Sequence, residues 1–346
     1  MNRAGTVLIR ADGSKAIGMG HLNRSYLIAG MLKKDFGLQT KVLMRQDPLG
    51  EGFARSRGLD VVTFSAATMQ EEIAFLRKTA EGETPRLVFL DVLENDTDPV
   101  YIDSLRVFGA PVVAITDDSL RRIINADLIV NGNPAQIGQD YSFESGKYLL
   151  GPKYFLMDEA YAGAHQDRPV KEVGKILVTL GASDHNDLMF KLLDALKMVS
   201  HEFALLLIVS SACGYLDRLK SYLSVYPRKC DLYIDTPTLV PFWKQADAAI
   251  TAGGNTLFER IAARVPGVTL CQLIRQNEIA GAFEKLGVNM NLGFGPQLHV
   301  LKIKEGVERF LDDPSVRSMQ YERSPDHVDG KGLKRLADEL GHLLKL

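Results

Sequence analysis

The amino-acid sequence predicts an α/β protein with two parallel-sheet domains, and three observations support this prediction. First, 346 residues are more than one hydrophobic core of ordinary size accommodates. Second, short, nearly continuous apolar runs alternate with segments of helical periodicity, as is typical of parallel strands covered by helices on both faces. Third, the alternation breaks at Gly151–Pro169, where Gly, Pro, His and Asp collect, and then begins again. We therefore expect one domain over residues 1–160 and a second over 170–346, with a ligand cleft between them.

The composition is that of a soluble globular protein, with 46% hydrophobic and 24% charged residues. The formal net charge is −2 and no long basic run occurs, so we expect no nucleic-acid partner. Cys213, Cys230 and Cys271 are widely spaced, which favours a reducing compartment over a disulfide framework or a zinc site. The sequence shows neither a signal-peptide pattern nor the roughly 20 consecutive apolar residues that span a bilayer. We therefore expect a cytoplasmic protein without integral membrane association.

In the first domain, apolar runs predict strands and periodic segments predict the helices between them. The expected strands are Val7–Arg10, Lys41–Met44, Val61–Phe64, Leu87–Asp91, Val112–Thr116 and Leu128–Asn131. A first helix follows the first strand, with a core face formed by Leu22, Tyr26, Ile28, Met31 and Leu32. Parts of later helices are expected at Glu71–Lys78 and Val100–Phe108.

The second domain repeats this pattern after the break. The expected strands are Lys175–Leu180, Ala204–Val209, Leu232–Ile234, Ala248–Ala252 and Gly267–Cys271. The expected helices are Asp187–Val199, Gly214–Val225, Thr238–Ala246, Asn255–Ala263 and Glu278–Leu286. A second parallel sheet is therefore predicted.

A glycine turn that ends in a histidine connects the first strand to the first helix. It reads Arg10-Ala-Asp12-Gly-Ser14-Lys-Ala-Ile-Gly18-Met-Gly20-His21-Leu-Asn-Arg24. Glycines let the backbone approach a ligand closely, and a helix start offers unpaired N–H groups. The positive end of the helix dipole also favours the neutral, basic form of a histidine held there. The turn is either a ligand site with His21 as a base or an ordinary connection with a surface histidine.

A second glycine turn, in the other domain, has the features of a nucleotide site. It reads Ile250-Thr251-Ala252-Gly253-Gly254-Asn255-Thr256-Leu-Phe-Glu259. A helix that opens with Asn and Thr offers amide donors and a favourable dipole to a phosphate. Glu259 lies one turn later on the face of Asn255, where a carboxylate can accept hydrogen bonds from ribose hydroxyls. Helix capping would explain Asn255 or Thr256 alone, but not both glycines together with Glu259. We therefore assign Gly253, Gly254, Asn255, Thr256 and Glu259 to nucleotide binding.

A shorter segment, Thr179–Asn186, ends the first strand of the second domain. Its small residues leave room for a diphosphate, with Gly181 and Ser183 as candidate nucleotide contacts. A loop that merely caps the next helix explains the same residues.

Two polar pairs are candidate sugar contacts. Gln276 and Asn277 precede a predicted helix, and their uncharged amides suit sugar hydroxyls or an acetamido group. Asp117 and Asp118 close a strand of the first domain, where they either hold sugar hydroxyls or raise the pKa of one carboxyl group. Helix capping remains the alternative for both pairs.

In this order, the motifs give the chain a resemblance to the UDP-sugar hydrolase of bacterial pseudaminic acid synthesis and to spore-coat polysaccharide biosynthesis proteins. More distantly, the chain is similar to the N-acetylglucosaminyltransferase that makes lipid II. The resemblance extends over nearly the whole chain. The matching segments are Arg10–Asp12, Ile17–Arg24, Thr116–Asp118, Gly151–Tyr154, Leu180–Asp184, Ala252–Glu259 and Val328–Gly332.

The resemblance implies a GT-B architecture, in which two Rossmann-like domains face each other across a cleft. It also implies that the C-terminal domain binds the nucleotide, that the N-terminal domain faces the sugar, and that no metal or other cofactor is required. His21 matches the family's catalytic histidine, and Glu259 matches the carboxylate that holds the ribose. We assign Asp12 to catalysis with His21. Gly20, Arg24, Asp117, Asp118, Gln276 and Asn277 are assigned to sugar binding.

The expected activity is hydrolysis of a UDP-activated acetamido deoxy-sugar, in which His21 activates water and UDP leaves with inversion. The hydrolase pattern has a tyrosine where this chain has Leu93. A second hypothesis is therefore an inverting glycosyltransferase, in which the same base deprotonates an acceptor hydroxyl of a further substrate. A third hypothesis is a noncatalytic nucleotide-sugar binding protein.

Overall fold

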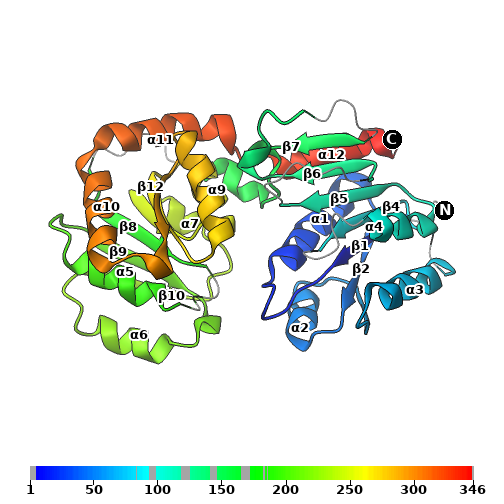
Figure 1. Cartoon of the computed structure of the whole chain (residues 1–346), viewed down its shortest axis with the longest axis horizontal. Coiled ribbons are helices and arrows are strands. Elements are labelled where there is room, and N and C mark those ends of the chain that lie inside the picture. Colours follow the sequence, from blue (N-terminus) through cyan, green and yellow to red (C-terminus); the bar gives the residue numbers. More distant parts are fainter. Residues whose placement is uncertain are drawn as a thin grey trace. The chain divides into compact units, whose positions relative to one another are not determined.

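The computed structural model describes residues 5–82, 84–92, 99–117, 125–140, 146–164, 172–181, 184 and 186–344, and the chain divides into two compact α/β units (Figure 1). Unit 1 contains the chain up to Asp158 together with the segment from Lys331 onward. Unit 2 is the segment Glu159–Gly330. The predicted α/β class with two parallel sheets is confirmed.

The described part of unit 1 contains a seven-stranded parallel sheet in the order β3-β2-β1-β4-β5-β6-β7. Its strands are β1 (Thr6–Ala11), β2 (Gln39–Arg45), β3 (Val61–Phe64), β4 (Leu87–Asp91), β5 (Val112–Thr116), β6 (Leu128–Asn131) and β7 (Lys147–Leu150). All six strands expected from the sequence are present, and β7 is additional. The register pairs Ala11 with Asp91, so the turn that follows β1 begins beside the last residue of β4.

Helices cover both faces of this sheet, which explains why its strands are almost continuously apolar. They are α1 (Gly20–Phe36), α2 (Pro48–Ser56), α3 (Met69–Ala80), α4 (Pro99–Leu105) and α12 (Gly332–Leu343). Alternate residues of β1 enter different cores. Val7 and Ile9 pack into the core that α1 and α12 share, whereas Leu8 packs with α3 and α4 on the other face. Tyr26, expected on the core face of α1, is 38% exposed.

Helix α12 belongs to unit 1, although the sequence suggested that the whole chain after residue 170 forms the second domain. Leu333, Leu336 and Leu340 are buried in the same core as Val7 and Ile9 of β1. A Cβ atom on Gly332 would overlap the backbone of Phe155, so the start of α12 packs directly on the chain that leaves unit 1. This apolar face places the helix in unit 1.

Unit 2 has a six-stranded parallel sheet over its described residues, in the order β10-β9-β8-β11-β12-β13. The strands are β8 (Lys175–Thr179), β9 (Ala204–Val209), β10 (Cys230–Ile234), β11 (Ala248–Thr251), β12 (Gly267–Cys271) and β13 (Met290–Phe294). The helices are α5 (Leu188–Lys197), α6 (Leu216–Leu223), α7 (Val240–Trp243), α8 (Asn255–Ala262), α9 (Ile274–Lys285), α10 (Val300–Asp312) and α11 (Pro314–His327). Strand β13 and helices α10 and α11 are additional to those expected, and α9 begins about one turn before Glu278.

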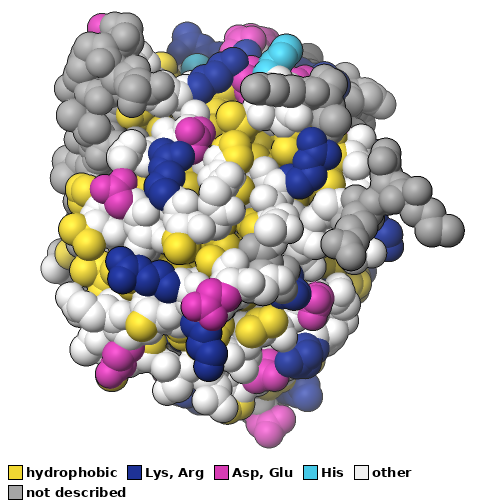
Figure 2. Space-filling model, turned by 90° about the vertical axis from the view of Figure 1, so that its right-hand side faces the viewer, with side chains coloured by type: hydrophobic (Ala, Val, Ile, Leu, Met, Phe, Trp, Pro, Cys, Tyr) yellow, Lys and Arg dark blue, Asp and Glu magenta, His cyan; other side chains and the backbone are white. Residues whose placement is uncertain are grey.

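On the face shown in Figure 2, acidic and basic side chains are interspersed, with small apolar areas between them. This mixture agrees with the near-zero net charge of the chain. Among the described residues, no helix combines the length and the apolar composition that crossing a membrane requires.

Candidate active site

His21 lies in the first turn of α1, directly after the glycine turn. Ser14 and Gly18 close this turn with a pair of backbone hydrogen bonds, and Gly18 has a φ of +80°, which glycine adopts readily. Gly20 is the first residue of α1 and adjoins His21. The side chain of His21 is 12% exposed. The turn therefore brings this imidazole to the carboxyl end of the unit 1 sheet.

Asp91, which the sequence did not lead us to assign to the site, is the carboxylate partner of His21. The Nδ1 atom of His21 lies 2.7 Å from Oδ1 of Asp91, the last residue of β4. Burial by itself would raise the pKa of Asp91, but the charges of Arg24 and His21 outweigh it and hold this pKa at about 2. Asp91 is therefore ionised at neutral pH and can only accept a hydrogen bond. Nη2 of Arg24 also lies 3.0 Å from Nδ1, but this nitrogen donates to Oδ1 of Asp91 at 2.6 Å. A proton on Nδ1 therefore suits the contact with the ionised carboxylate, and this tautomer leaves Nε2 as the basic nitrogen.

Arg24 joins Asp91 to Asp117. Its Nε and Nη2 atoms donate to Oδ2 and Oδ1 of Asp91 at 2.8 and 2.6 Å. Its Nη1 atom donates to Oδ2 and Oδ1 of Asp117 at 2.8 and 3.0 Å. Burial lowers the pKa of Arg24, but Asp117 and Asp91 raise it further, so the guanidinium stays charged. The sequence suggested that Arg24 contacts a sugar, whereas in the structure each of its three nitrogens donates to a carboxylate.

Asp117, at the end of β5, has a side chain that is 32% exposed and therefore open to a ligand. Its backbone carbonyl accepts a hydrogen bond from Asn133. The structure thus brings together His21, Arg24 and Asp117 of the predicted site. Asp118, Ser183 and Leu93 lie outside the described residues.

Asp12 belongs to a different network. Its two oxygens accept hydrogen bonds from Arg10 at 2.6 Å each, and Oδ1 also accepts the backbone N–H of Arg45 at 2.8 Å. Arg10 also donates to Glu72, and both of these residues are fully buried. These contacts tie the end of β1 to β2 and to α3, and they differ from those of the His21 cluster. They give Asp12 the environment of a buried structural ion pair.

In unit 2, the second glycine turn lies between β11 and α8, beside the start of α9. A Cβ atom on Gly253 would lie 2.6 Å from the backbone oxygen of Gln276, so this close approach requires glycine. A Cβ on Gly254 would lie 3.7 Å from the Gln276 amide nitrogen. Asn255 and Thr256 begin α8, and Gly254, the residue at the N-cap position, has no side chain to cap the helix start. Its N-terminal amides are therefore suited to an anion.

Glu259 lies in the second turn of α8 and receives a hydrogen bond from Tyr161, in the short helical segment Glu159–Gly163. Tyr161 is 6% exposed, and burial, followed by the Glu259 charge, raises the pKa of its hydroxyl. The phenol therefore stays protonated and can donate to Glu259. Tyr161 was missed because it lies in the aperiodic segment that looked like a linker.

The remaining predicted contacts of unit 2 have local partners. The Gln276 side-chain oxygen accepts the backbone N–H of Gln272 at 2.9 Å, and the Asn277 side-chain oxygen accepts from Asn291 at 2.8 Å. Asp184, beyond Gly181, accepts the N–H groups of Leu188 and Met189. It thereby caps α5, as the capping alternative for this loop predicted. Gly181 has a φ of +89°.

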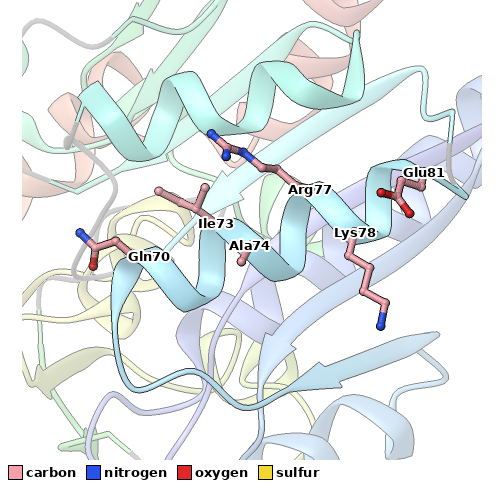
Figure 3. Close-up of a pocket in the computed structure, with 6 residues that line it drawn as sticks. All are labelled: Gln70, Ile73, Ala74, Arg77, Lys78 and Glu81. Atoms are coloured by element: carbon pink, nitrogen blue, oxygen red, sulfur yellow. The ribbon is translucent and has the colours of Figure 1, made fainter.

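A surface hollow of about 650 Å³ beside α3 contains none of the predicted site residues. It is lined by Gln70, Ile73, Ala74, Arg77, Lys78 and Glu81. Its two basic side chains, Arg77 and Lys78, point in different directions (Figure 3). Among the described residues, no group of three or more His, Cys, Asp and Glu is arranged to hold a metal ion.

The chain is similar in sequence to the spore coat polysaccharide biosynthesis protein SpsG of Bacillus subtilis strain 168. The two are 26% identical over 332 residues, which cover 95% of each chain. No protein-family model matches the chain.

Solved structures share the fold at low sequence identity. MurG of Acinetobacter baumannii superimposes with a TM-score of 0.73 at 13% identity, over 98% of this chain and 99% of MurG. The calicheamicin glycosyltransferase CalG4 has a TM-score of 0.67 at 17% identity, over 99% of both chains. The spinosyn rhamnosyltransferase SpnG, solved with thymidine diphosphate, has a TM-score of 0.62 at 14% identity over 96% of this chain and 99% of SpnG. The chain therefore has the GT-B fold.

Proposed function

We propose that this protein is a glycosyltransferase that transfers a sugar from a nucleoside diphosphate to an acceptor hydroxyl. The His21–Asp91 pair is the observation that carries the catalytic part of the proposal, because it provides a general base beside a buried carboxylate. This base could activate either water or an acceptor hydroxyl. The names of the similar proteins support the transferase hypothesis better than the hydrolase that we first expected. The likeness to SpsG supports a role in polysaccharide biosynthesis.

In the proposed reaction, Nε2 of His21 takes the proton of the acceptor hydroxyl as its oxygen attacks the anomeric carbon. The bond from that carbon to the diphosphate breaks, the configuration inverts, and the nucleoside diphosphate leaves. The N-terminal amides of α8 and the helix dipole stabilise the growing negative charge of the leaving group. Asp91 stabilises the imidazolium that forms at His21.

For nucleotide recognition, we propose that Gly253, Gly254, Asn255 and Thr256 bind the diphosphate and that Glu259 accepts hydrogen bonds from the ribose. Tyr161 holds Glu259 in place for this contact. UDP and an amino sugar remain our proposal for the donor. Gln276, whose amide lies beside Gly254, is the proposed contact to the sugar in unit 2.

The test is to incubate the protein with UDP-, TDP-, CDP- and GDP-activated amino sugars, with and without a panel of sugar and polysaccharide acceptors. Release of nucleoside diphosphate that requires an acceptor supports the transferase. Release of free sugar and nucleoside diphosphate in the absence of any acceptor would show that the protein is a hydrolase and would contradict the transferase proposal. Tight binding of the nucleotide sugar without any turnover would contradict both enzyme hypotheses and would indicate a nucleotide-sugar binding protein.

His21→Ala connects this activity to the site. Turnover should fall by about 10²–10⁴-fold, the range that a general base contributes, while UDP affinity stays near that of the parent. Unchanged turnover would remove His21 from the mechanism.

A further inference from the structure

Arg24 is buried between two carboxylates of unit 1. It follows His21 by three residues on α1, so both side chains leave the same face of the helix. Arg24 is 6% exposed and contacts two carboxylates that end different strands, Asp91 on β4 and Asp117 after β5. One buried guanidinium therefore connects three elements at the carboxyl edge of the sheet.

The shape of the guanidinium matters for this connection. Its Nε and Nη2 edge faces Asp91, and its Nη1 atom reaches Asp117. A planar group with fixed donor directions serves both carboxylates at once, whereas the single ammonium of lysine provides no such fork. Asp91 thereby accepts from Arg24 through both of its oxygens, and its Oδ1 atom also lies 2.7 Å from Nδ1 of His21.

The charge of Arg24 matters separately from its shape. Among the described residues, the charged groups that contact His21 are Asp91 and Arg24, with Asp117 beyond Arg24. A carboxylate next to an imidazole stabilises the protonated ring, which cannot act as a base. The positive charge of Arg24, which contacts both Asp91 and His21, opposes that effect.

We propose that Arg24 is a positioning residue that fixes Asp91 against His21, offsets the negative charge of that carboxylate, and holds Asp117 at a set distance from His21. This inference rests on the proposed function, in which His21 is the base. It replaces the sugar contact that the sequence suggested for Arg24.

Two substitutions separate shape from charge. Arg24→Lys keeps the positive charge but loses the fixed donor directions of the guanidinium, so kcat should fall by about 10–100-fold. The acidic limb of the plot of kcat/KM against pH should not move. In Arg24→Gln the charge is also lost, so the acidic limb should move to higher pH because His21 holds its proton more strongly. KM for the donor and the Kd of UDP should stay within about twofold in both, since the proposed nucleotide residues lie in unit 2.

Arg106→Lys is the control, because Arg106 also pairs with an aspartate of unit 1, Asp127, and among the described residues it donates only to Asp127 and to the backbone of Asn125. It should retain the parent kcat and pH profile. Melting temperatures and circular dichroism of all variants identify loss of folded protein, which lowers kcat without moving a pH limb. If Arg24→Gln does not fold, Arg24→Lys still tests the inference.

A measurement without substrate separates this inference from the proposed function. The imidazole of His21 is titrated by NMR, with its signal assigned by comparison with His21→Ala. The midpoint should lie at higher pH in Arg24→Gln than in the parent and in Arg24→Lys. An unmoved midpoint, or full kcat in Arg24→Lys, would overturn the role of Arg24 even if the enzyme transfers sugars. If the His21 midpoint moves in Arg24→Gln but the protein turns over no nucleotide sugar, the role of Arg24 is supported and the proposed function is rejected.

Discussion

His21 and Asp91 are separated by 70 positions in the sequence, yet Nδ1 of the imidazole lies 2.7 Å from Oδ1 of the carboxylate. Parallel pairing of β1 with β4 brings them together, because Ala11 lies beside Asp91 and the turn after β1 returns to α1 within ten residues. Geometry of this kind fixes both the orientation and the tautomer of the ring.

Asp91→Asn should lower kcat by about 10²–10⁴-fold. The amide does not distinguish the two tautomers as a carboxylate does and supplies no charge to stabilise the imidazolium. The measurement is kcat of the variant across pH 5–9, with UDP affinity as the control for folding and nucleotide binding. A kcat within twofold of the parent would show that His21 acts without Asp91.

Asp91 should also make the protein sensitive to acid. Its pKa of about 2 in the folded protein lies below the ordinary value of 3.8, so its stabilising contribution is complete above about pH 4 and is lost as the pH falls toward 2. The linked free energy is about 2 kcal/mol. Urea unfolding at pH 2–5 should show a steeper loss of stability in the parent than in Asp91→Asn. Equal slopes would contradict the low pKa.

Glu259→Ala should weaken UDP binding by about tenfold or more, because the ribose loses its charged acceptor. The same variant should no longer discriminate UDP from 2′-deoxy-UDP, provided that the parent prefers UDP. Calorimetry with both ligands tests this. The UDP affinity of Tyr161→Phe should lie between that of the parent and that of Glu259→Ala. If Glu259→Ala retains the parent's preference for UDP, Glu259 does not bind the ribose.

Gly253→Ala and Gly254→Ala form a matched pair. The new methyl group at residue 253 would meet the backbone of Gln276 at 2.6 Å, whereas at residue 254 its nearest neighbour is a side-chain nitrogen at 3.7 Å. Gly253→Ala should therefore lose about 1–3 kcal/mol of stability and weaken nucleotide binding, with a much smaller effect from Gly254→Ala. Thermal unfolding and UDP titration measure both effects. Similar results for the two variants would show that the approach of α9 is not what constrains this turn.

Asp12→Ala should primarily affect folding. It leaves Arg10 buried without its bidentate partner, and breaking such a pair costs about 3–5 kcal/mol. The measurement is kcat per folded molecule, with the folded fraction taken from denaturant unfolding. A large loss of kcat in a fully folded Asp12→Ala protein would show that Asp12 takes part in catalysis.

The sequence was sufficient to predict local features. Apolar runs located the strands, and the turn before His21 was found because its glycines and the helix start are adjacent in the chain. Asp91 was not assigned, since its role depends on which strand pairs with β1. A carboxylate that directly ends a buried strand is the signal that would have identified it. Arg24 was assigned to a sugar because the sequence does not reveal the two carboxylates that fold around it.

Helix α12 has a consequence for how this chain folds during synthesis. The core of unit 1 is completed by Leu333, Leu336 and Leu340, which are translated after all of unit 2. We therefore expect the apolar side chains of unit 1 that α12 covers to stay exposed while the ribosome makes residues 159–330. Unit 1 closes only when the segment beyond Lys331 emerges. Translation arrest before that point should therefore leave unit 1 sensitive to protease, whereas the segment 159–330 has its own sheet and core.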